Sequence, residues 1–116
     1  MSLRTRSKQA RRIAPAPVFA ALGDATRLRL VGRLSERSPQ SVSSLTEHSK
    51  LTRQAISKHL RVLEEAGLVE NVRLGRESLY ALRAEPIDDA RQYLEEVSRQ
   101  WGDALKRLKS FIEKET

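Results

Sequence analysis

The chain has 116 residues, enough for one compact domain, and carries 22 Lys and Arg against 15 Asp and Glu, a net charge of +7. It has no cysteine, which excludes disulfides and thiolate metal sites, and no apolar run approaches the roughly 18 residues of a membrane span. We therefore expect a cytoplasmic protein without a membrane partner, whose basic surface favours a polyanion such as nucleic acid.

The positive charge lies in the first two-thirds of the chain. Residues 1–16 carry +5, residues 17–83 carry +4 and residues 84–116 carry −2. Residues 1–14 have no apolar period, which predicts a basic disordered tail. Two interpretations of this tail stay open: a solubilising extension, or an arm that touches DNA phosphates.

Two helices are predicted after the tail. A short apolar face around Phe19 ends at Gly23, and Asp24 is a good N-cap for the helix that follows. Segment 35–40, which contains a proline, is predicted to be a loop. The buried stripe of the second helix is expected to consist of Leu28, Leu30, Val31 and Leu34.

A helix, a short turn and another helix come next. Ser41 is expected to cap the first of these helices and Thr52 the second, with a turn at 49–51 between them. Gly67 stands where a helix-ending left-handed residue belongs. The apolar positions of the second helix are Ala55, Ile56, Leu60, Val62, Leu63 and Ala66.

Residues 68–74 and 77–82 are rich in Val, Leu and Tyr, and Gly75 and Arg76 separate them. This pattern predicts a β-hairpin with its turn at these two residues. Arginines at 73 and 76 flank the turn, where they suit a narrow DNA groove or the phosphates beside it.

The last segment, which begins at Pro86, is predicted to be one helix about 43 Å long. Its apolar residues recur every seven positions in two sets, which is a heptad seam over four repeats. The seam is larger than the small domain before it can cover, so we expect a homodimer. The expected interface residues are Phe19, Ile87, Leu94, Val97, Trp101, Leu105, Leu108 and Phe111.

Opposite the apolar side of the helix over 52–66 lies a face of donors with little hydrophobic area. Gln54 can read adenine through two hydrogen bonds, Ser57 is adaptable, and Lys58 can read guanine. Such a face after a short turn is what the major groove of B-DNA accepts. The residues expected to bind DNA, with the two wing arginines included, are Thr52, Arg53, Gln54, Ser57, Lys58, Arg61, Arg73 and Arg76.

Three segments together resemble the ArsR family of bacterial transcriptional regulators: ALGDATRLRLV at 21–31, LTRQAISKHLRVLEEAGLV at 51–69, and the wing RLGR at 73–76 with Tyr80 and Leu82. The resemblance covers about residues 17–83. It implies a winged-helix dimer that binds a two-fold symmetric operator and typically leaves it when an effector binds. In that family the dimer contacts come from the N-terminal and C-terminal helices, which agrees with the heptad seam.

The chain departs from the metal-sensing members of this family. Those members carry a Cys-x-Cys motif near the helix before the recognition helix, or His and acidic ligands on the C-terminal helix. Here residues 43–49 contain no Cys and residues 86–116 contain no His. We therefore expect a regulator of the non-metal-sensing type, with no metal site and no cofactor.

Catalytic patterns are also missing from the sequence. His59 falls on the apolar side of its helix, where a hydrogen-bonded, partly buried role is expected, and it does not face Ser57 as a nucleophile's base would. No phosphate-binding Gly-rich loop and no serine elbow is present. We expect no catalytic residues and no enzyme activity.

The fold class predicted is mainly α with a small β-hairpin wing: a winged helix-turn-helix with a long C-terminal dimerisation helix. Its parts are a tail over 1–14, a DNA-binding domain over 15–84 and a dimerisation helix over 85–116. The predicted function is that of a homodimeric repressor that binds double-stranded DNA at a palindromic operator, with an effector of small-molecule or protein nature left open. Two alternatives remain: a winged-helix module for protein interaction, and a non-specific architectural DNA-binding protein.

Overall fold

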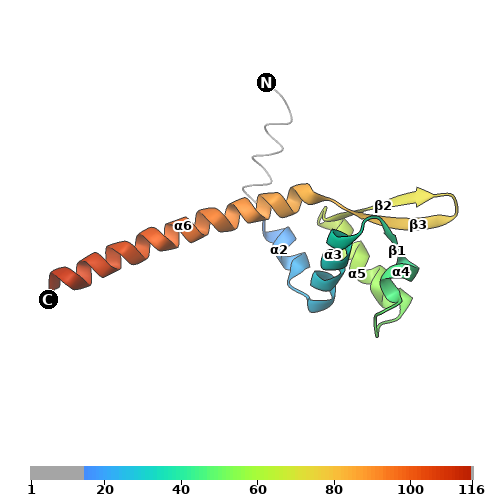
Figure 1. Ribbon diagram of the computed structural model, residues 1–116, viewed down its shortest axis with the longest axis horizontal. Helices are drawn as coiled ribbons and strands as arrows, with labels where there is room; N and C mark the ends of the chain where they lie inside the picture. Colours follow the sequence, from blue (N-terminus) through green and yellow to red (C-terminus); the bar gives the residue numbers. More distant parts are fainter. Residues whose placement is uncertain (1–14, 116) are drawn as a thin grey trace, which may run out of the picture.

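The computed structural model describes residues 15–115, so the tail predicted over 1–14 lies outside the described residues. A compact group of helices and a small sheet are followed by one long helix that extends away from them (Figure 1). Within the described residues this is a mainly helical winged fold, as the sequence predicts. In chain order the elements are α2 (Ala16–Leu22), α3 (Ala25–Glu36), β1 (Gln40–Ser41), α4 (Val42–Thr46), α5 (Arg53–Glu65), β2 (Val69–Leu74), β3 (Glu77–Leu82) and α6 (Ala84–Glu115).

Side-chain caps fix where three of the helices begin. The Asp24 carboxylate accepts the backbone N–H groups of Thr26 at 2.8 Å and Arg27 at 3.1 Å at the start of α3. The hydroxyl oxygen of Ser41 accepts from the first turn of α4, and that of Thr52 accepts from the first turn of α5. These bonds satisfy donors that have no partner inside the helix. The three predicted N-caps are confirmed.

The core lies between α3, α4, α5 and the sheet. Its largest fully buried side chains include Leu34, Leu45, Ile56 and Leu60. Leu28 was expected in the stripe of α3 but is 56% exposed, so that prediction is wrong. At ~100° per residue Leu28 stands about 120° away from Leu34, and the side of the helix that faces the core is completed by Arg27 instead.

The sheet has three antiparallel strands in the order β1-β3-β2. The hairpin of β2 and β3 matches the prediction, and Gly75 takes a left-handed φ of 62° in its turn. The predicted loop over 35–40 is wrong at both ends, because α3 continues to Glu36 and Gln40 begins β1. Gln40 is buried, donates its amide to the backbone oxygens of Arg33 and Arg37, and pairs with Tyr80 of β3, a distant partner that no local pattern reveals.

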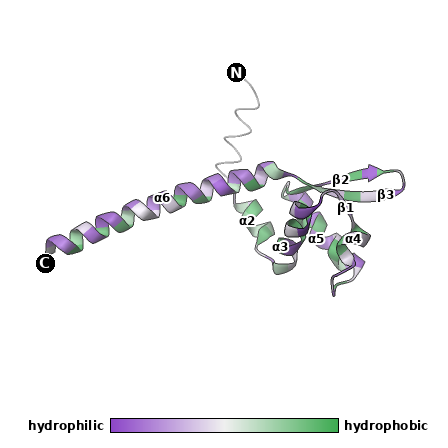
Figure 2. Ribbon diagram, in the orientation of Figure 1, coloured by the Kyte–Doolittle hydropathy of each residue, from purple (hydrophilic) through white to green (hydrophobic). Residues whose placement is uncertain are grey.

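Helix α6 is a single rod of 32 residues, about 48 Å long, in which apolar and polar residues alternate along its whole length (Figure 2). It begins at Ala84, two residues before the predicted start at Pro86, because proline is tolerated in the first turn of a helix. Its start packs on the domain through Ile87 and through Ala90, which is buried. Beyond this contact the rod leaves the domain.

Candidate nucleic-acid interface

Helix α5 divides into a buried side and an exposed side. Ile56, Leu60 and Leu63 are buried in the core. On the other side Arg53, Gln54, Lys58 and Arg61 are exposed and Ser57 is half-buried. The structure therefore places the predicted DNA-reading residues of this helix together on one outward face. Thr52 is exposed in front of them, with its hydroxyl oxygen accepting the N–H of Ala55 at 3.1 Å.

Arg33 of α3 binds α4, the short helix that precedes α5. Its guanidinium donates to the carbonyl oxygen of Leu45 at 2.5 Å and to that of Ser44 at 2.8 Å, both in α4. The last carbonyls of a helix have no partner within the helix, and a cation there also suits the helix dipole. This role of Arg33 was not predicted from the sequence. The spacing of Arg33 three residues after Leu30, on the edge of the buried stripe, is the signal that could have indicated it.

His59 joins α5 to α3 through Arg27. Its Nδ1 lies 3.2 Å from the Arg27 guanidinium, which also donates through Nε to the carbonyl oxygen of Ala21 at 2.6 Å. Three helices, α2, α3 and α5, are thus joined through one arginine. The predicted role of His59, hydrogen-bonded and partly buried, is confirmed. Together with the buried Ile56, Leu60 and Leu63, these contacts hold α5 with its polar side facing outward.

Asp24 lies beside the contact between Arg27 and His59, with its carboxylate 4.0 Å from His59 Nδ1. The N–H of Arg27 and then that of Thr26 donate to the carboxylate and hold the pKa of Asp24 below its ordinary value, and the charge of Arg27 adds to the effect. Asp24 is therefore ionised near neutral pH, and its negative charge strengthens the hydrogen bonds that it accepts as the N-cap of α3.

The wing places two further cations at its tip. In the hairpin Arg73 pairs with Ser78 across the strands and Leu74 pairs with Glu77. Arg73 and Arg76 are both exposed on either side of Gly75. The sheet holds this tip at one side of the domain, beyond the helices (Figure 1).

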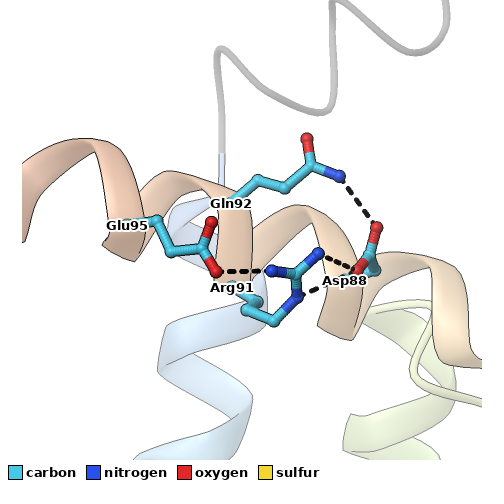
Figure 3. Close-up of polar contacts among 4 residues, drawn as sticks. All are labelled: Asp88, Arg91, Gln92 and Glu95. Atoms are coloured by element: carbon cyan, nitrogen blue, oxygen red, sulfur yellow. Dashed lines mark hydrogen bonds and ion pairs between the residues drawn. The ribbon is translucent and has the colours of Figure 1, made fainter.

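The cations of α5 and of the wing share one electrostatic property. Within residues 15–115 none of them has a carboxylate oxygen within 4.0 Å; they are Arg53, Lys58, Arg61, Arg73 and Arg76. Arg91 on α6 is different, because it bonds to both Asp88 and Glu95 (Figure 3), and Arg99 likewise pairs with Glu96. Arg91 and Arg99 of α6 are thus neutralised by neighbouring carboxylates, whereas the five cations of α5 and the wing form a surface of unneutralised positive charge. Such a surface attracts a polyanion.

The residues predicted for a dimer interface fall into two groups. Ile87 packs against the core of its own domain, and the half-buried Phe19 lies beside Tyr93 with ring centroids 6.0 Å apart. These two residues hold α6 on the domain. Val97 is half-buried, and the remaining large side chains are exposed: Leu94, Trp101, Leu105, Leu108 and Phe111.

Comparisons with known proteins agree with this geometry. A helix-turn-helix domain family matches residues 22–72. YuzN, an uncharacterised HTH-type transcriptional regulator of Bacillus subtilis, is 42% identical over 76 residues, which are 60% of this chain and 83% of YuzN. The arsenical resistance operon repressor of Bacillus subtilis is 34% identical over 70 residues, 60% of this chain and 67% of that protein.

A solved structure of an ArsR-like transcriptional regulator from Rhodococcus sp. RHA1 superposes with a TM-score of 0.73 and is 36% identical. The match covers 94% of this chain and 96% of that one, so it includes the long helix as well as the domain. The chain belongs to the ArsR family of transcriptional regulators. This ArsR-family chain is a DNA-binding regulator with a helix-turn-helix domain, and its relatives identify it as a regulator rather than an enzyme.

Two further observations concern other partners of this ArsR-family chain. None of the helices within residues 15–115 combines the length and the apolar character that crossing a bilayer requires. Over the same residues, no group of three or more His, Cys, Asp or Glu side chains is placed to hold a metal ion. That the chain binds no metal and no cofactor stays a prediction.

Proposed function

We propose that the chain is a homodimeric repressor that places two copies of α5 in successive major grooves of a two-fold symmetric operator. The observation that carries this proposal is the outward face of α5, where Arg53, Lys58 and Arg61 stand without carboxylate partners beside a wing with two more such cations. Five cations without carboxylate partners repel one another, and together they attract a polyanion strongly.

The roles of the individual residues follow from their positions. Gln54 and Lys58 read base edges from the exposed face of α5, and the half-buried Ser57 reads them from the side of that face. Arg53 and Arg61 contact phosphates from the two ends of that face. The remaining contacts to the backbone come from Thr52, Arg73 and Arg76.

The proposed dimer is supported by the exposed apolar seam of α6. Trp101 is 65% exposed and Phe111 is 62% exposed. Large apolar side chains gain from removal from water, and a heptad spacing lets a second copy of the helix cover all of them along one seam. Two recognition helices joined in this way must lie about 34–36 Å apart to meet one face of a duplex. Repression is favoured because the arsenical resistance relative bears the name of a repressor.

The test is a pair of substitutions measured on DNA that the full chain selects in vitro. Gln54→Ala is expected to weaken binding to the selected duplex about tenfold and to leave binding to an unrelated duplex unchanged, because it removes a base contact. Arg76→Ala is expected to weaken both equally and to lower the salt dependence of binding, because it removes a phosphate contact. Fluorescence anisotropy over a series of salt concentrations measures both quantities.

The matched control for Gln54→Ala is Gln100→Ala, because Gln100 is an exposed glutamine of α6 that lies away from the proposed DNA-binding face. Equal losses from Gln54→Ala on both duplexes would contradict the proposed division of roles. Equal affinity of the unmodified chain for selected and unrelated duplexes would contradict a specific repressor and favour an architectural protein.

A further inference from the structure

A cavity of about 340 Å³ lies between α3 and the turn that joins α4 to α5. Four α3 residues spaced as on one helical face form one wall, and four residues of the turn form the opposite wall. One residue each from α4 and α5 closes it. The lining residues are Thr26, Arg29, Leu30, Arg33, Leu45, His48, Ser49, Lys50, Leu51 and Ile56.

The floor of this cavity is apolar. Leu30, Leu45 and Ile56 are almost completely removed from solvent, and Leu51 is partly exposed above them. A volume at the lower end of the range for ligand sites, with such a floor, suits a small molecule that has an apolar body.

The rim of the cavity is cationic. Arg29, Arg33 and Lys50 line it together with His48, and no Asp or Glu is among the lining residues. Across residues 15–115, no carboxylate oxygen lies within 4.0 Å of these three cations. Arg33 donates to the carbonyl groups of α4, which fixes its position and leaves its charge unneutralised.

We propose that this cavity binds a small amphipathic anion, an aromatic or aliphatic carboxylate, as a ligand of the regulator. The carboxylate lies at the exposed ends of Arg29 and Lys50, where it gains charge-assisted hydrogen bonds. The apolar body lies on Leu30, Leu45 and Ile56, where it gains from removal from water. A DNA phosphate satisfies only the first requirement. Ile56 also points away from the exposed side of α5, so the floor is not part of the proposed DNA-reading face.

The position of the cavity links such a ligand to DNA binding. One wall is α3, which bears Arg27, and the other is the turn that ends at Thr52, the N-cap of α5. A ligand that joins the two walls changes how the turn and the start of α5 are held against α3. Ligand and DNA must then change each other's affinity by the same factor. This coupling rests on the proposed function, whereas ligand binding itself does not.

The first experiment measures ligand binding without DNA, by calorimetry on the full chain at constant ionic strength. The probes are 1-naphthoate, the near-isosteric neutral 1-naphthamide, and inorganic phosphate. We expect naphthoate to bind about tenfold more tightly than either of the others, because only it offers both a charge and an apolar body. Equal affinity of naphthoate and naphthamide, or of naphthoate and phosphate, would overturn the proposal.

The variants locate the site. Arg29→Gln combined with Lys50→Gln removes two exposed cations of the rim and is expected to weaken naphthoate binding about tenfold. Lys106→Gln combined with Lys109→Gln removes the same charge from α6 and is expected to change it less than about twofold. Thermal melting of both variants checks that they fold. Unchanged naphthoate binding in the Arg29/Lys50 variant would show that the probe binds elsewhere and would overturn the proposal.

The second experiment tests the coupling. The affinity for the selected duplex is measured with and without saturating naphthoate, for the unmodified chain and for the Arg29/Lys50 variant. A change in duplex affinity in the unmodified chain that disappears in the variant supports the coupling. A variant that loses duplex affinity while the chain ignores naphthoate would assign these cations to DNA phosphates, and would overturn the ligand site without touching the proposed function.

Discussion

The domain over residues 15–83 and the outer part of α6 carry apolar residues at equally regular helical spacings, yet the two regions use them differently. In the domain, Leu34, Leu45 and Leu60 are fully buried. On α6, Trp101, Leu108 and Phe111 are more than half exposed. The comparison teaches that periodicity shows which face of a helix is apolar, and that only the remaining structure shows whether the same chain covers it.

The charged side chains of the two regions also differ, because those of α6 include ion pairs and the cations of α5 do not. On α6, Arg91 is held between Asp88 and Glu95, and Gln92 also bonds to Asp88 (Figure 3). On α5 the arginines have no such partners within the described residues. The domain buries most of its large apolar side chains and leaves the cations of α5 and the wing without carboxylate partners. Helix α6 pairs Arg91 and Arg99 with carboxylates and leaves most of its large apolar side chains exposed. Each region thereby indicates the kind of partner it accepts.

The largest effect is expected from charges placed in the seam. Leu94→Glu combined with Leu108→Glu is expected to abolish the proposed dimer, because burying unpaired carboxylates costs several kcal/mol for each charge. Sedimentation velocity measures the assembly state, and the loss of tight operator binding should accompany it. Lys106→Gln combined with Ser110→Glu changes the net charge by the same amount away from the seam and should leave the dimer intact. A monomeric unmodified chain would contradict the seam.

A smaller effect separates the two kinds of apolar residue. Leu60→Ala is expected to lower the free energy of unfolding by about 2–5 kcal/mol at any protein concentration, because it leaves a cavity in the core. Leu105→Ala, at an exposed position of α6, is expected to change it by no more than about 0.5 kcal/mol in dilute solution and by more as the concentration rises. Urea denaturation at two concentrations measures both. A concentration-independent loss for Leu105→Ala would mean that its own chain covers it.

Replacing glycine by alanine is expected to change stability in opposite directions at two positions. Gly75→Ala is expected to destabilise the wing by about 1–2 kcal/mol, since a φ of 62° is left-handed. Gly102→Ala, inside α6 with nothing within 4 Å of the added methyl group, is expected to stabilise the helix by up to about 1 kcal/mol. Thermal unfolding followed by circular dichroism compares the two variants. A loss at Gly102 would indicate that a partner helix approaches closely there.

The smallest expected effect is the loss of stability at low pH when Asp24 becomes protonated. The pKa of Asp24 lies below its ordinary value of 3.8, so its contribution to stability is complete above that pH and is lost as the pH falls through the lower folded value. Asp24→Asn keeps an N-cap but removes the titration, so stability below pH 3.8 should fall less steeply than in the unmodified chain. Denaturation between pH 2 and about 5 measures this slope.

Glu96→Gln is the matched control for that experiment. The pKa of Glu96 is also lowered, by the hydrogen bond from Arg99, but both groups are exposed on α6. Its effect should be weaker than that of Asp24→Asn and should disappear in high salt, because the solvent screens exposed pairs. Identical slopes for the two variants would show that the cap at Asp24 contributes nothing beyond a surface ion pair.

The starts of α3, α4 and α5, the hairpin, and the apolar and polar faces of α5 and α6 could be predicted from the sequence alone. Asp24, Ser41 and Thr52 act through neighbours two or three residues away, and Gly75 through its own backbone, so local chemistry is sufficient to predict them. Regular spacing likewise separated the outward side of α5 from its buried side.

Only the tertiary structure decided what depends on contacts between distant segments. Strand β1 exists because β3 pairs with it, and Leu28 is exposed because no element within residues 15–115 covers its side of α3. The sequence assigned no role to Arg27 or Arg33, which in the structure join α3 to α5 and α4. The cavity beside Lys50 also arises from segments about 20 residues apart in the chain. The local sequence pattern determines which face of a helix or strand a side chain lies on. The fold of the whole chain determines which groups that side chain contacts.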